Sequence, residues 1–411
     1  MIKSTKKLLQ NISAETSKRR DILLKIADYV LEEITPKKLF KSELSKIKTE
    51  NYKKVIIISM GKAAKEMAGA VIPLLDRQPD KVLFADEGHP LPTLIGIKKT
   101  EEIIKESREL GEDDLAIVLI SGGASAMFVK PANGITLGEK IQLTKDLLKS
   151  GANINEINVV RKHISDVKGG RLAAMLFPAT VMGLVISDVV GNDLSTIASG
   201  PISPDTSTFV DAINIIKKYK INAPKNIIQQ LETPKPNEKY NERYFRKVTV
   251  KIIADHATVI KKAEFRAKEL GLKTELLSGF VTGEAREVAA KIVKNAPKNR
   301  LLIGCGETTV TCRGNGSGGR NQEFALSALK HLSEGQTLLS VGTDGIDGIC
   351  PEPIAGAIVD NEIISQSKEQ NLAIEDYLNR NDSYNFFAKT GGHIITGSTG
   401  TNLGDLILVL S

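Results

Sequence analysis

The chain of 411 residues contains no tryptophan, and aromatic residues make up only 4% of it. Proteins that bind single-stranded nucleic acid stack bases on aromatic side chains, so this composition argues against such a surface. Cysteine is also scarce: Cys305, Cys312 and Cys350 form no CxxC pair and have no zinc-ligand spacing. We therefore expect three reduced, structural thiols, as in a cytoplasmic protein.

Long apolar runs are missing as well. No segment approaches the roughly 20 apolar residues of a membrane-spanning helix. The first residues, MIKSTKKLLQNISAETSKRR, are basic but contain no apolar core, so they do not predict a signal peptide. These observations predict a cytoplasmic location and no membrane partner. The richness in Lys, Glu and Ile, with little Gln, is typical of thermophiles.

The excess of positive charge is small. The chain has 56 basic and 49 acidic residues, a net charge of +7 that is spread along the sequence. Nucleic-acid-binding proteins concentrate more positive charge on one surface, so we expect no nucleic-acid partner. Anionic small molecules are compatible ligands, and we expect a homodimer only because it is the commonest assembly.

Apolar strands alternate with helical segments in the first half of the chain. The runs at residues 55–59, 81–86, 114–121 and 180–188 are apolar on both faces, as buried strands are. Helical periodicity separates them, which favours a parallel sheet with helices on both faces. A chain of this length is too long for a single core, so two domains are expected.

A polar segment with two prolines, residues 232–247, is the candidate linker between these domains. After it, the alternation of strands and helices restarts at residues 248–255 and continues to the last strand. The sequence therefore predicts two α/β domains, residues 1–240 and 241–411. It leaves open whether the last strand returns to the first domain.

Ligands of an open α/β sheet bind beyond the carboxyl ends of its strands, so the residues that follow each strand are informative. The first strand is followed by SMGKAAKE, in which Lys62 is expected in the first turn of a helix. A cation there opposes the helix dipole by roughly 0.3–1 kcal/mol, unless an anion is held at the same end. The alternative is an exposed lysine that bends away from the helix end.

Two further segments join paired glycines to a helix. The stretch ISGGASAMF contains Gly122, Gly123, Ala124 and Ser125, and HISDVKGGRLAA contains Lys168, Gly169 and Gly170. Backbone N–H groups in such turns can hold phosphate or carboxylate oxygens. The alternative is a tight turn that needs glycine for its geometry alone. A hydrolase built on Ser125 is disfavoured, because the second glycine of a nucleophile elbow is missing.

The segment GETTVTCRGNGSGGRNQEFAL, residues 306–326, has four glycines and two arginines in eight residues between a strand and a helix. Gly314, Gly316 and Gly319 match G-x-G-x-x-G, and Asp344 follows the next strand, so a nucleotide or dinucleotide site stays open. Arg320 at the helix start favours a charged phosphoryl group over a nicotinamide. No Walker A motif occurs. We expect this loop to approach a polyphosphate or a small carboxylate.

Acidic residues at strand ends supply the other half of a phosphoryl-transfer site. Asp188 and Asp193 flank a loop rich in Ser, Thr and Gly, and Glu307 and Asp344 lie on either side of the glycine-rich loop in sequence. Magnesium with a nucleotide needs only one or two carboxylates beside phosphate oxygens and water. Asp344 and Asp347 are equally well explained by turns in which an aspartate bonds its own backbone.

Together these blocks resemble the glycerate 2-kinase family, whose C-terminal half is the MOFRL domain. The matching stretches, from about residue 55 to the end, are SMGKAAKEMA, DEGHPLPT, LISGGASAMF, RKHISDVKGGRLA, SDVVGNDLSTIASGP, GCGETTVTCRGNGSGGRNQEFAL, GTDGIDG and GGHIITGSTGTNLGDL. The resemblance implies an N-terminal Rossmann-like parallel sheet with helices on both faces, a second α/β (MOFRL) domain, and an active site in the interdomain cleft. It also implies ATP- and Mg²⁺-dependent phosphorylation of D-glycerate, favours the 2-hydroxyl, and makes Lys62 and Arg320 essential.

We therefore expect a kinase in which Lys62 and Arg320 neutralise charge on the transferred phosphoryl group. Asp188 or Asp193 would bind Mg²⁺ or take the hydroxyl proton. The expected catalytic residues are Lys62, Arg320, Asp188 and Asp193, and the expected Mg²⁺ ligands are Asp188, Asp193 and Asp344. The expected binding residues for ATP or glycerate are Gly122, Gly123, Ala124, Ser125, Lys168, Gly169, Gly170, Glu307, Gly316, Gly318, Gly319 and Asn321. The rivals are an NAD(P)H-dependent hydroxypyruvate reductase, the Ser125 hydrolase and a non-catalytic anion-binding protein.

Overall fold

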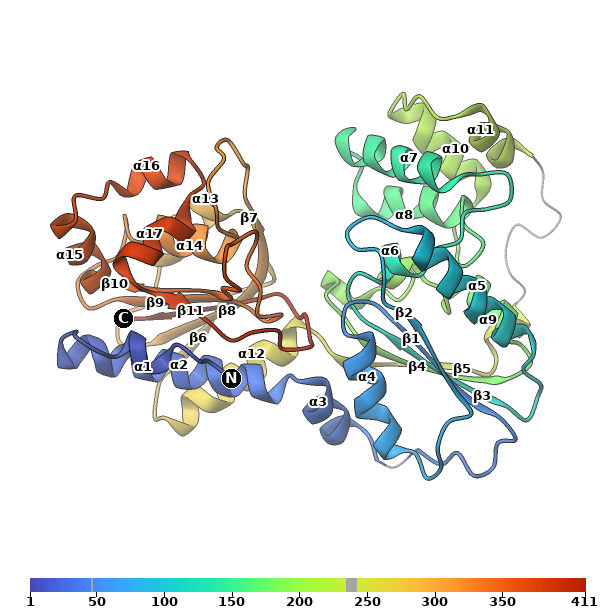
Figure 1. The fold of residues 1–411 in the computed structure, drawn as a ribbon, viewed down its shortest axis with the longest axis horizontal. Coiled ribbons are helices and arrows are strands. Elements are labelled where there is room, and N and C mark those ends of the chain that lie inside the picture. Colours follow the sequence, from blue (N-terminus) through green and yellow to red (C-terminus); the bar gives the residue numbers. More distant parts are fainter. Residues whose placement is uncertain (46, 234–241) are drawn as a thin grey trace. The chain divides into compact units, whose positions relative to one another are not determined.

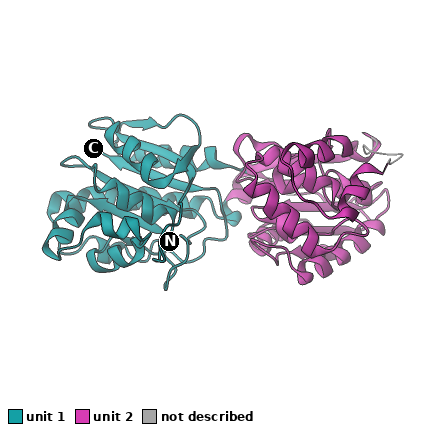
Figure 2. Ribbon diagram, turned by 90° about the horizontal axis from the view of Figure 1, so that it is seen from above, with its two compact units in different colours: residues 1–38, 254–411 teal, residues 39–253 magenta. Residues whose placement is uncertain are grey.

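The computed structural model describes residues 1–45, 47–233 and 242–411 (Figure 1). The described chain folds into two compact units, which Figure 2 shows in different colours. Unit 1 comprises residues 1–38 and 254–411, and unit 2 comprises residues 39–253. The domain boundary predicted between residues 240 and 241 lies in segment 234–241, outside the described residues, and stays a prediction. Part of the predicted linker lies there too.

Unit 2 is built on a five-stranded sheet with the order β2-β1-β3-β4-β5. The strands are β1 (Val55–Met60), β2 (Lys81–Ala85), β3 (Leu115–Ile120), β4 (Thr180–Ile186) and β5 (Val248–Ala254). The pairs β1–β2, β1–β3 and β3–β4 are parallel, so the predicted parallel sheet is confirmed. Every residue of β1 and β3 is buried, because side chains point to both faces and both faces are covered.

Helices of unit 2 cover this sheet and also enclose an apolar cluster of their own. That second cluster includes Leu143, Ile157 and Ile213, and it lies among α7 (Leu137–Lys149), α8 (Ile154–His163), α10 (Phe209–Lys218) and α11 (Lys225–Glu232) (Figure 1). The other helices are α3 (Pro36–Glu43), which contains the boundary between the units, α4 (Ala64–Val71), α5 (Leu94–Arg108), α6 (Ala124–Met127) and α9 (Arg171–Leu176). Short 3₁₀ turns are η1 (Ile72–Leu74), η2 (Val190–Asn192), η3 (Ile197–Ser199) and η4 (Glu242–Phe245).

Unit 1 is built on a mixed sheet with the order β11-β10-β9-β12-β8-β6, in which β7 also pairs with β8. The strands are β6 (Thr274–Leu276), β7 (Val281–Glu284), β8 (Leu301–Thr309), β9 (Thr337–Gly342), β10 (Gly356–Asp360), β11 (His393–Ile394) and β12 (Asp405–Leu410). The last strand, β12, lies between β8 and β9 and is antiparallel to both. It is therefore a central strand of this sheet.

The first helices of the chain belong to unit 1. Helices α1 (Thr5–Leu8), α2 (Ala14–Glu33) and α12 (His256–Glu269) lie on one side of the sheet in Figure 1. On the other side lie α13 (Ala285–Lys294), α14 (Arg320–Ala328), α15 (Asn361–Glu369), α16 (Ile374–Asn379) and α17 (Ser383–Thr390). A buried ion pair ties α2 to the end of β10: Nε and Nη2 of Arg20 donate to Oδ2 and Oδ1 of Asp360 at 2.7 and 2.8 Å.

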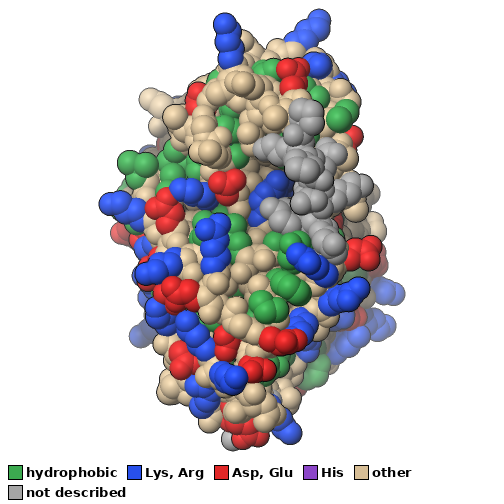
Figure 3. All heavy atoms as spheres, turned by 90° about the vertical axis from the view of Figure 1, so that its right-hand side faces the viewer, with side chains coloured by type: hydrophobic (Ala, Val, Ile, Leu, Met, Phe, Trp, Pro, Cys, Tyr) green, Lys and Arg blue, Asp and Glu red, His purple; other side chains and the backbone are tan. Residues whose placement is uncertain are grey.

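The described surface carries charges of both signs. Figure 3 shows one face of the molecule, on which basic and acidic side chains are interspersed. Exposed pairs such as Lys53–Asp113, at 2.7 Å, belong to this pattern. Isolated pairs of this kind contribute only about 0–1 kcal/mol to folding. Among the described residues, no helix is long and apolar enough to span a membrane.

Candidate active site

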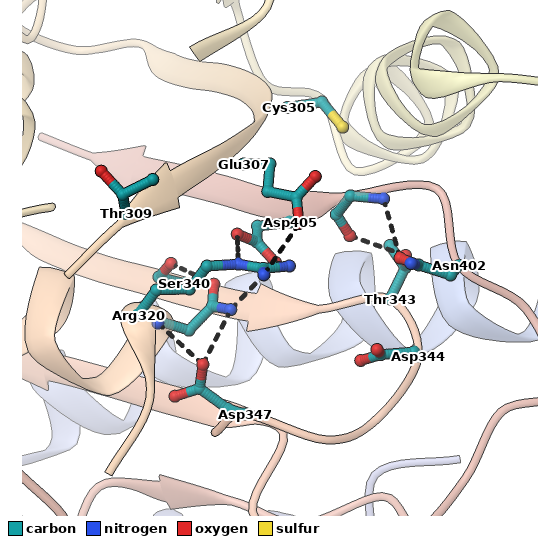
Figure 4. Close-up of polar contacts among 12 residues, drawn as sticks. Cys305, Glu307, Thr309, Arg320, Ser340, Thr343, Asp344, Asp347, Asn402 and Asp405 are labelled. Carbon is teal, nitrogen blue, oxygen red and sulfur yellow. Dashed lines mark hydrogen bonds and ion pairs between the residues drawn. The ribbon is translucent and has the colours of Figure 1, made fainter. Parts of the chain in front are cut away.

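Arg320, the first residue of α14, is held by two carboxylates of the unit 1 sheet (Figure 4). Its Nε and Nη2 donate to Oδ2 and Oδ1 of Asp405 at 2.6 and 3.0 Å, and its Nη1 donates to Oε1 of Glu307 at 2.9 Å. Burial lowers the pKa of Arg320, but the hydrogen bond and charge of Asp405 outweigh burial and hold this pKa above its ordinary value. The guanidinium is therefore always charged and fixed in orientation.

Asp405 is the partner that the sequence did not reveal. It is the first residue of β12, is 2% exposed, and lies opposite Gly306 and Gly342 of the neighbouring strands. Its Oδ1 also accepts a hydrogen bond from Nδ2 of Asn321 at 3.0 Å. Asp405 lies in the stretch GGHIITGSTGTNLGDL, but its contact with Arg320 could not be predicted, because the two residues meet only through the pairing of strands remote in sequence.

Asp347 caps the N-terminal end of α14. Its fully buried carboxylate accepts hydrogen bonds from the N–H groups of Asn321 and Gln322 at 2.9 and 2.8 Å, and from Nε2 of Gln322 at 3.0 Å. Burial raises the pKa of Asp347 to about 6, although the two backbone hydrogen bonds oppose that shift. The side chain thus satisfies helix N–H groups that would otherwise lack acceptors.

The glycine-rich loop that precedes Arg320 packs against the chain's own backbone. A Cβ at Gly316 would lie 2.5 Å from Cβ of Asp382 and 2.7 Å from the carbonyl oxygen of Arg380. A Cβ at Gly319 would collide with Asp347, and one at Gly318 with Ser383. On one side of the loop the glycines therefore allow close contact with residues 380–383 and Asp347.

The other side of this loop faces a cavity of about 480 Å³. Its lining includes Gly316, Gly318, Gly319, Arg320 and Asp344. Oδ1 of Asp344 accepts a hydrogen bond from the N–H of Ile346 at 3.1 Å, which is the turn considered from the sequence. The volume lies in the range of small-molecule sites, roughly 300–1,000 Å³. The cavity brings together most of the residues predicted in this half of the chain.

Lys62 lies in unit 2 between β1 and α4, and its side chain is exposed. The predicted position in the first turn is off by two residues, because α4 begins at Ala64. The N–H of Lys62 donates to the carbonyl oxygen of Gly122 at 2.9 Å. A Cβ at Gly123, where φ is +84°, would lie 3.2 Å from Cγ of Lys62 and 2.9 Å from Cδ2 of His89. Burial, then the charge of Lys62, lowers the pKa of His89.

A smaller cavity of unit 2, about 130 Å³, is lined by residues 121–125 and by side chains from three other segments. It unites Gly122, Gly123, Ala124 and Ser125 with Asp188, as predicted for residues that follow neighbouring parallel strands. Two further lining residues, Asn158 and Arg161 of α8, were missed. The available signal was their spacing from Ile154, which places all three on one face of the helix.

Asp193, Lys168, Gly169 and Gly170 are not among the residues that line this cavity. Asp193 accepts hydrogen bonds from the N–H and Oγ of Ser195 and from Oγ1 of Thr196, each at 2.9 Å. Burial raises the pKa of Asp193, but these hydrogen bonds outweigh it and lower the pKa overall. The carboxylate therefore organises the turn that leads into η3.

Lys168, Gly169 and Gly170 donate hydrogen bonds to the segment of residues 198–200, which includes the end of η3. Nζ of Lys168 donates to the carbonyl oxygens of Phe128 and Ala198, both at 3.3 Å, and the side chain is 1% exposed. The N–H groups of Gly169 and Gly170 donate to the carbonyl oxygens of Ser199 and Gly200 at 3.0 and 2.7 Å. These hydrogen bonds hold the segment that forms one wall of the small cavity.

The predicted metal ligands divide between the units. Asp188 and Asp193 belong to unit 2, and Asp344 belongs to unit 1. Within the ranges that the structure describes, no three or more His, Cys, Asp or Glu side chains form a group that could hold a metal ion. The role of these aspartates as Mg²⁺ ligands stays a prediction.

The sequence and the fold of the chain are similar to those of known proteins over most of the chain. A family model described as the MOFRL family matches residues 300–405, and one described as a domain of unknown function (DUF4147) matches residues 22–232. A D-glycerate 2-kinase from Thermotoga maritima is 39% identical over 95% of this chain and 98% of its own. The chain belongs to the glycerate 2-kinase family.

Further similar proteins support the assignment of this chain to the glycerate 2-kinase family. A glycerate 2-kinase from Pyrococcus horikoshii is 37% identical over 87% of this chain and 87% of its own. The crystal structure of a glycerate kinase from Thermotoga maritima, 38% identical, has a TM-score of 0.82 and covers 96% of this chain and 99% of that one. The α/β fold with two units is therefore that of the family, as the resemblance implied.

Proposed function

We propose that this chain is a glycerate 2-kinase, which transfers the γ-phosphoryl group of ATP to the 2-hydroxyl of D-glycerate. The bond from the γ-phosphorus to the oxygen it shares with the β-phosphate breaks, and a bond to the glycerate 2-oxygen forms. The products are ADP, 2-phosphoglycerate and the proton of the hydroxyl. This proposal rests on the similarity of the chain to relatives that are named for this activity. They are 39% and 37% identical and match 95% and 87% of this chain.

The cavity beside Arg320 is suited to bind phosphoryl groups. The buried Asp405 accepts hydrogen bonds from Nε and Nη2 of Arg320, whereas Nη1, within the described ranges, donates only to the exposed Glu307. A phosphoryl oxygen would compete with Glu307 for Nη1, and a guanidinium of fixed orientation suits the planar recognition of such oxygens. Gly316, Gly318 and Gly319 keep that wall of the cavity free of side chains.

Lys62 is proposed to neutralise negative charge in unit 2. Its exposed ammonium follows β1 beside the Gly122–Gly123 turn, where an anion would offset the effect of its charge on the start of α4. Phosphoryl transfer depends mainly on positioning and charge neutralisation, so each of the two cations would act on charge that develops in the reaction. Lys62 and Arg320 are the proposed catalytic cations.

Magnesium is proposed to accompany ATP. Asp188 fits this ion because its half-buried carboxylate lines a cavity, and Asp193 fits because hydrogen bonds keep it ionised. Asp344 fits as a carboxylate in the wall of the larger cavity. Oxygen donors of this kind are the ligands that Mg²⁺ prefers, and the bound ion would neutralise phosphate charge.

The proposal also includes a cytoplasmic location and a homodimer.

The test is an assay with D-glycerate, ATP and Mg²⁺ in which enolase is the only coupling enzyme. Phosphoenolpyruvate absorbance, which requires 2-phosphoglycerate, is the expected signal. Release of ADP without that absorbance would overturn the 2-position. Absence of ADP release, together with NADH or NADPH oxidation by hydroxypyruvate, would replace the kinase by the reductase.

A further inference from the structure

Three cationic side chains of unit 2 lie at or near the small cavity: Arg161 lines it, and Lys140 and Lys168 do not. Lys140 and Lys168 are 4% and 1% exposed, and Arg161 is half-buried in the last turn of α8. Nζ of Lys140 donates to the carbonyl oxygen of Ile164 at 3.2 Å, and Lys168 uses carbonyl oxygens as well. In residues 1–45, 47–233 and 242–411, none of the three forms an ion pair with a carboxylate.

The mutual repulsion of these cations can be relieved at the lysines but not at Arg161. Burial, followed by the charge of Arg161, lowers the pKa of Lys140 to about 7, and burial with Lys140 and Arg161 lowers that of Lys168. A guanidinium does not lose its proton in a protein. Burial alone lowers the pKa of Arg161, and no carboxylate in the part of the chain that the structure describes offsets this effect. A half-buried permanent cation without a partner is costly unless an anion joins it.

The cavity next to Arg161 is lined by one acidic residue, Asp188, and by neutral hydrogen-bonding groups in fixed orientations. Oδ1 of the buried Asn158 accepts from Oγ of Ser199 at 3.0 Å, which leaves its amide N–H groups as donors. Oγ of Ser125 lies 3.3 Å from Oγ of Ser199. A capping box anchors α8, and its Glu156 also accepts from Nζ of Lys218 at 2.6 Å. The polar face of α8 is therefore rigidly placed.

The backbone is strained in and next to the part of the cavity wall that residues 196–198 form. Ala198 and Ser199 have φ values of +53° and +59°, which is the left-handed region that side chains disfavour. Hydrogen bonds from Lys168 and Gly169 to their carbonyl oxygens hold them there. Consecutive residues of this kind persist only where the surroundings over-determine them, and they cluster at ligand sites. The shape of the cavity is thus built into the fold.

We propose that this cavity binds the carboxylate of D-glycerate, with Arg161 as its ion-pair partner and Asn158 as a neutral donor. That the ligand is D-glycerate rests on the proposed function. The volume, about 130 Å³, resembles that of an engineered cavity of about 150 Å³ that holds benzene, so it suits a molecule of this size. Because C2 is bonded to the carboxyl carbon, a fixed carboxylate also restricts where the 2-hydroxyl lies.

Arg161 has two alternative roles, and kinetic and stability measurements can distinguish both of them from carboxylate binding. An arginine in the last turn of a helix interacts favourably with the helix dipole, which would affect stability alone. A phosphate of ATP would offer the same anionic chemistry as a carboxylate. The variants are therefore Arg161→Ala and Arg161→Lys, with Arg108→Ala, an exposed arginine of α5 in the same unit, as the matched control.

The steady-state experiment measures kcat, the KM for D-glycerate and the KM for ATP in the full chain. We expect Arg161→Ala to raise the KM for D-glycerate about 10- to 100-fold, the range for loss of a charge-assisted hydrogen bond, and to leave the KM for ATP unchanged. Arg161→Lys should fall between it and the parent, and Arg108→Ala should match the parent. D-glyceramide, which lacks the charge, should bind the parent and Arg161→Ala equally well.

A raised KM for ATP alone would assign the cavity to a phosphate, and an unchanged KM for D-glycerate with a lower Tm would leave only the dipole role; either result overturns the proposal. Calorimetric titration with D-glycerate separates this proposal from the proposed function. If the parent protein shows no kinase activity, the function fails. D-glycerate binding that is lost in Arg161→Ala would then still support the carboxylate site, and equal or absent binding in both proteins would overturn it.

Discussion

Asp405 grips Arg320 through two parallel hydrogen bonds, at 2.6 and 3.0 Å, across 85 residues of sequence. One partner is the first residue of a helix, and the other is the first residue of the central strand β12. Paired N–H···O contacts of this kind fix the plane of a guanidinium as well as its position. The orientation of Arg320 is therefore set by the sheet rather than by its own helix.

Replacement of Asp405 by Asn should reduce kcat by at least tenfold, because one of the two hydrogen bonds to Arg320 is lost and the guanidinium can rotate. The loss of a charge-assisted hydrogen bond should also lower the free energy of unfolding by about 2 kcal/mol. Steady-state kinetics and urea denaturation measure the two effects. Glu307→Gln is the matched control: its exposed carboxylate holds only Nη1, so its stability should change by less than about 1 kcal/mol. Parent-like kcat in Asp405→Asn would contradict this account.

Lys62→Ala and Arg320→Ala should each lower kcat by about 10²-fold or more, and Lys62→Ala should leave the fold intact. Lys62 is exposed, so its removal takes away no core contact. The control for Lys62 is Lys65→Ala on α4, whose ammonium forms a surface ion pair with Asp86 at 3.2 Å. That variant should retain parent activity. Circular dichroism with the ADP-release assay measures both properties, and an active Lys62→Ala protein would remove Lys62 from the mechanism.

The buried Asp347 should make the stability of the protein depend on pH. Its pKa is raised to about 6 in the folded chain, against about 3.9 for an unfolded aspartate. The stabilising effect of this raised pKa is therefore complete below about pH 4 and is lost as the pH rises to about 6. Urea unfolding at pH 4, 5, 6 and 7, on the parent and on Asp347→Asn, tests this.

The free energy of unfolding of the parent, relative to Asp347→Asn, should fall between pH 4 and 6 and then level off. The comparison uses the slope with pH rather than the absolute stability, because the asparagine caps α14 less well. Parallel curves, or a difference that rises with pH, would show that Asp347 is not the group responsible.

Two glycine substitutions should distinguish a glycine that is needed for close packing from a helical glycine that is not. Gly319→Ala should lower the free energy of unfolding by about 1–3 kcal/mol, because the added Cβ collides with Asp347. Gly138→Ala is the matched control, since Gly138 lies in helix α7 with nothing within 4 Å of the added atom. It should raise the free energy of unfolding by about 0.5–1 kcal/mol. Thermal unfolding of both variants tests the contrast, and equal effects would refute it.

The sequence predicted those parts of the fold that depend on local pattern. Buried apolar runs located β1 and β3, and the glycines around Arg320 located the start of α14. These signals are local because the spacing of apolar residues and the conformations open to glycine act within a few residues. The same reasoning placed Lys62 two residues too far into its helix, since helix ends are less sharply encoded than helix interiors.

Contacts between remote segments could not be predicted. Asp405 meets Arg320 only because β12 inserts between β8 and β9, and Arg20 meets Asp360 across 340 residues. The sequence analysis did not single out Arg161, and only the structure shows that none of the described carboxylates forms an ion pair with it. Such features depend on strand order and packing, which a single sequence does not display.

The placement of α2 in unit 1 has a consequence for the order of events during synthesis. Arg20 leaves the ribosome 340 residues before its partner Asp360, and the central strand β12 follows Asp360. Unit 2, a continuous stretch of chain, is complete long before that. Domains generally fold as units while translation proceeds. The residues of α2 are therefore made before the whole of unit 2, and unit 1 can be completed around them only after β12 has emerged.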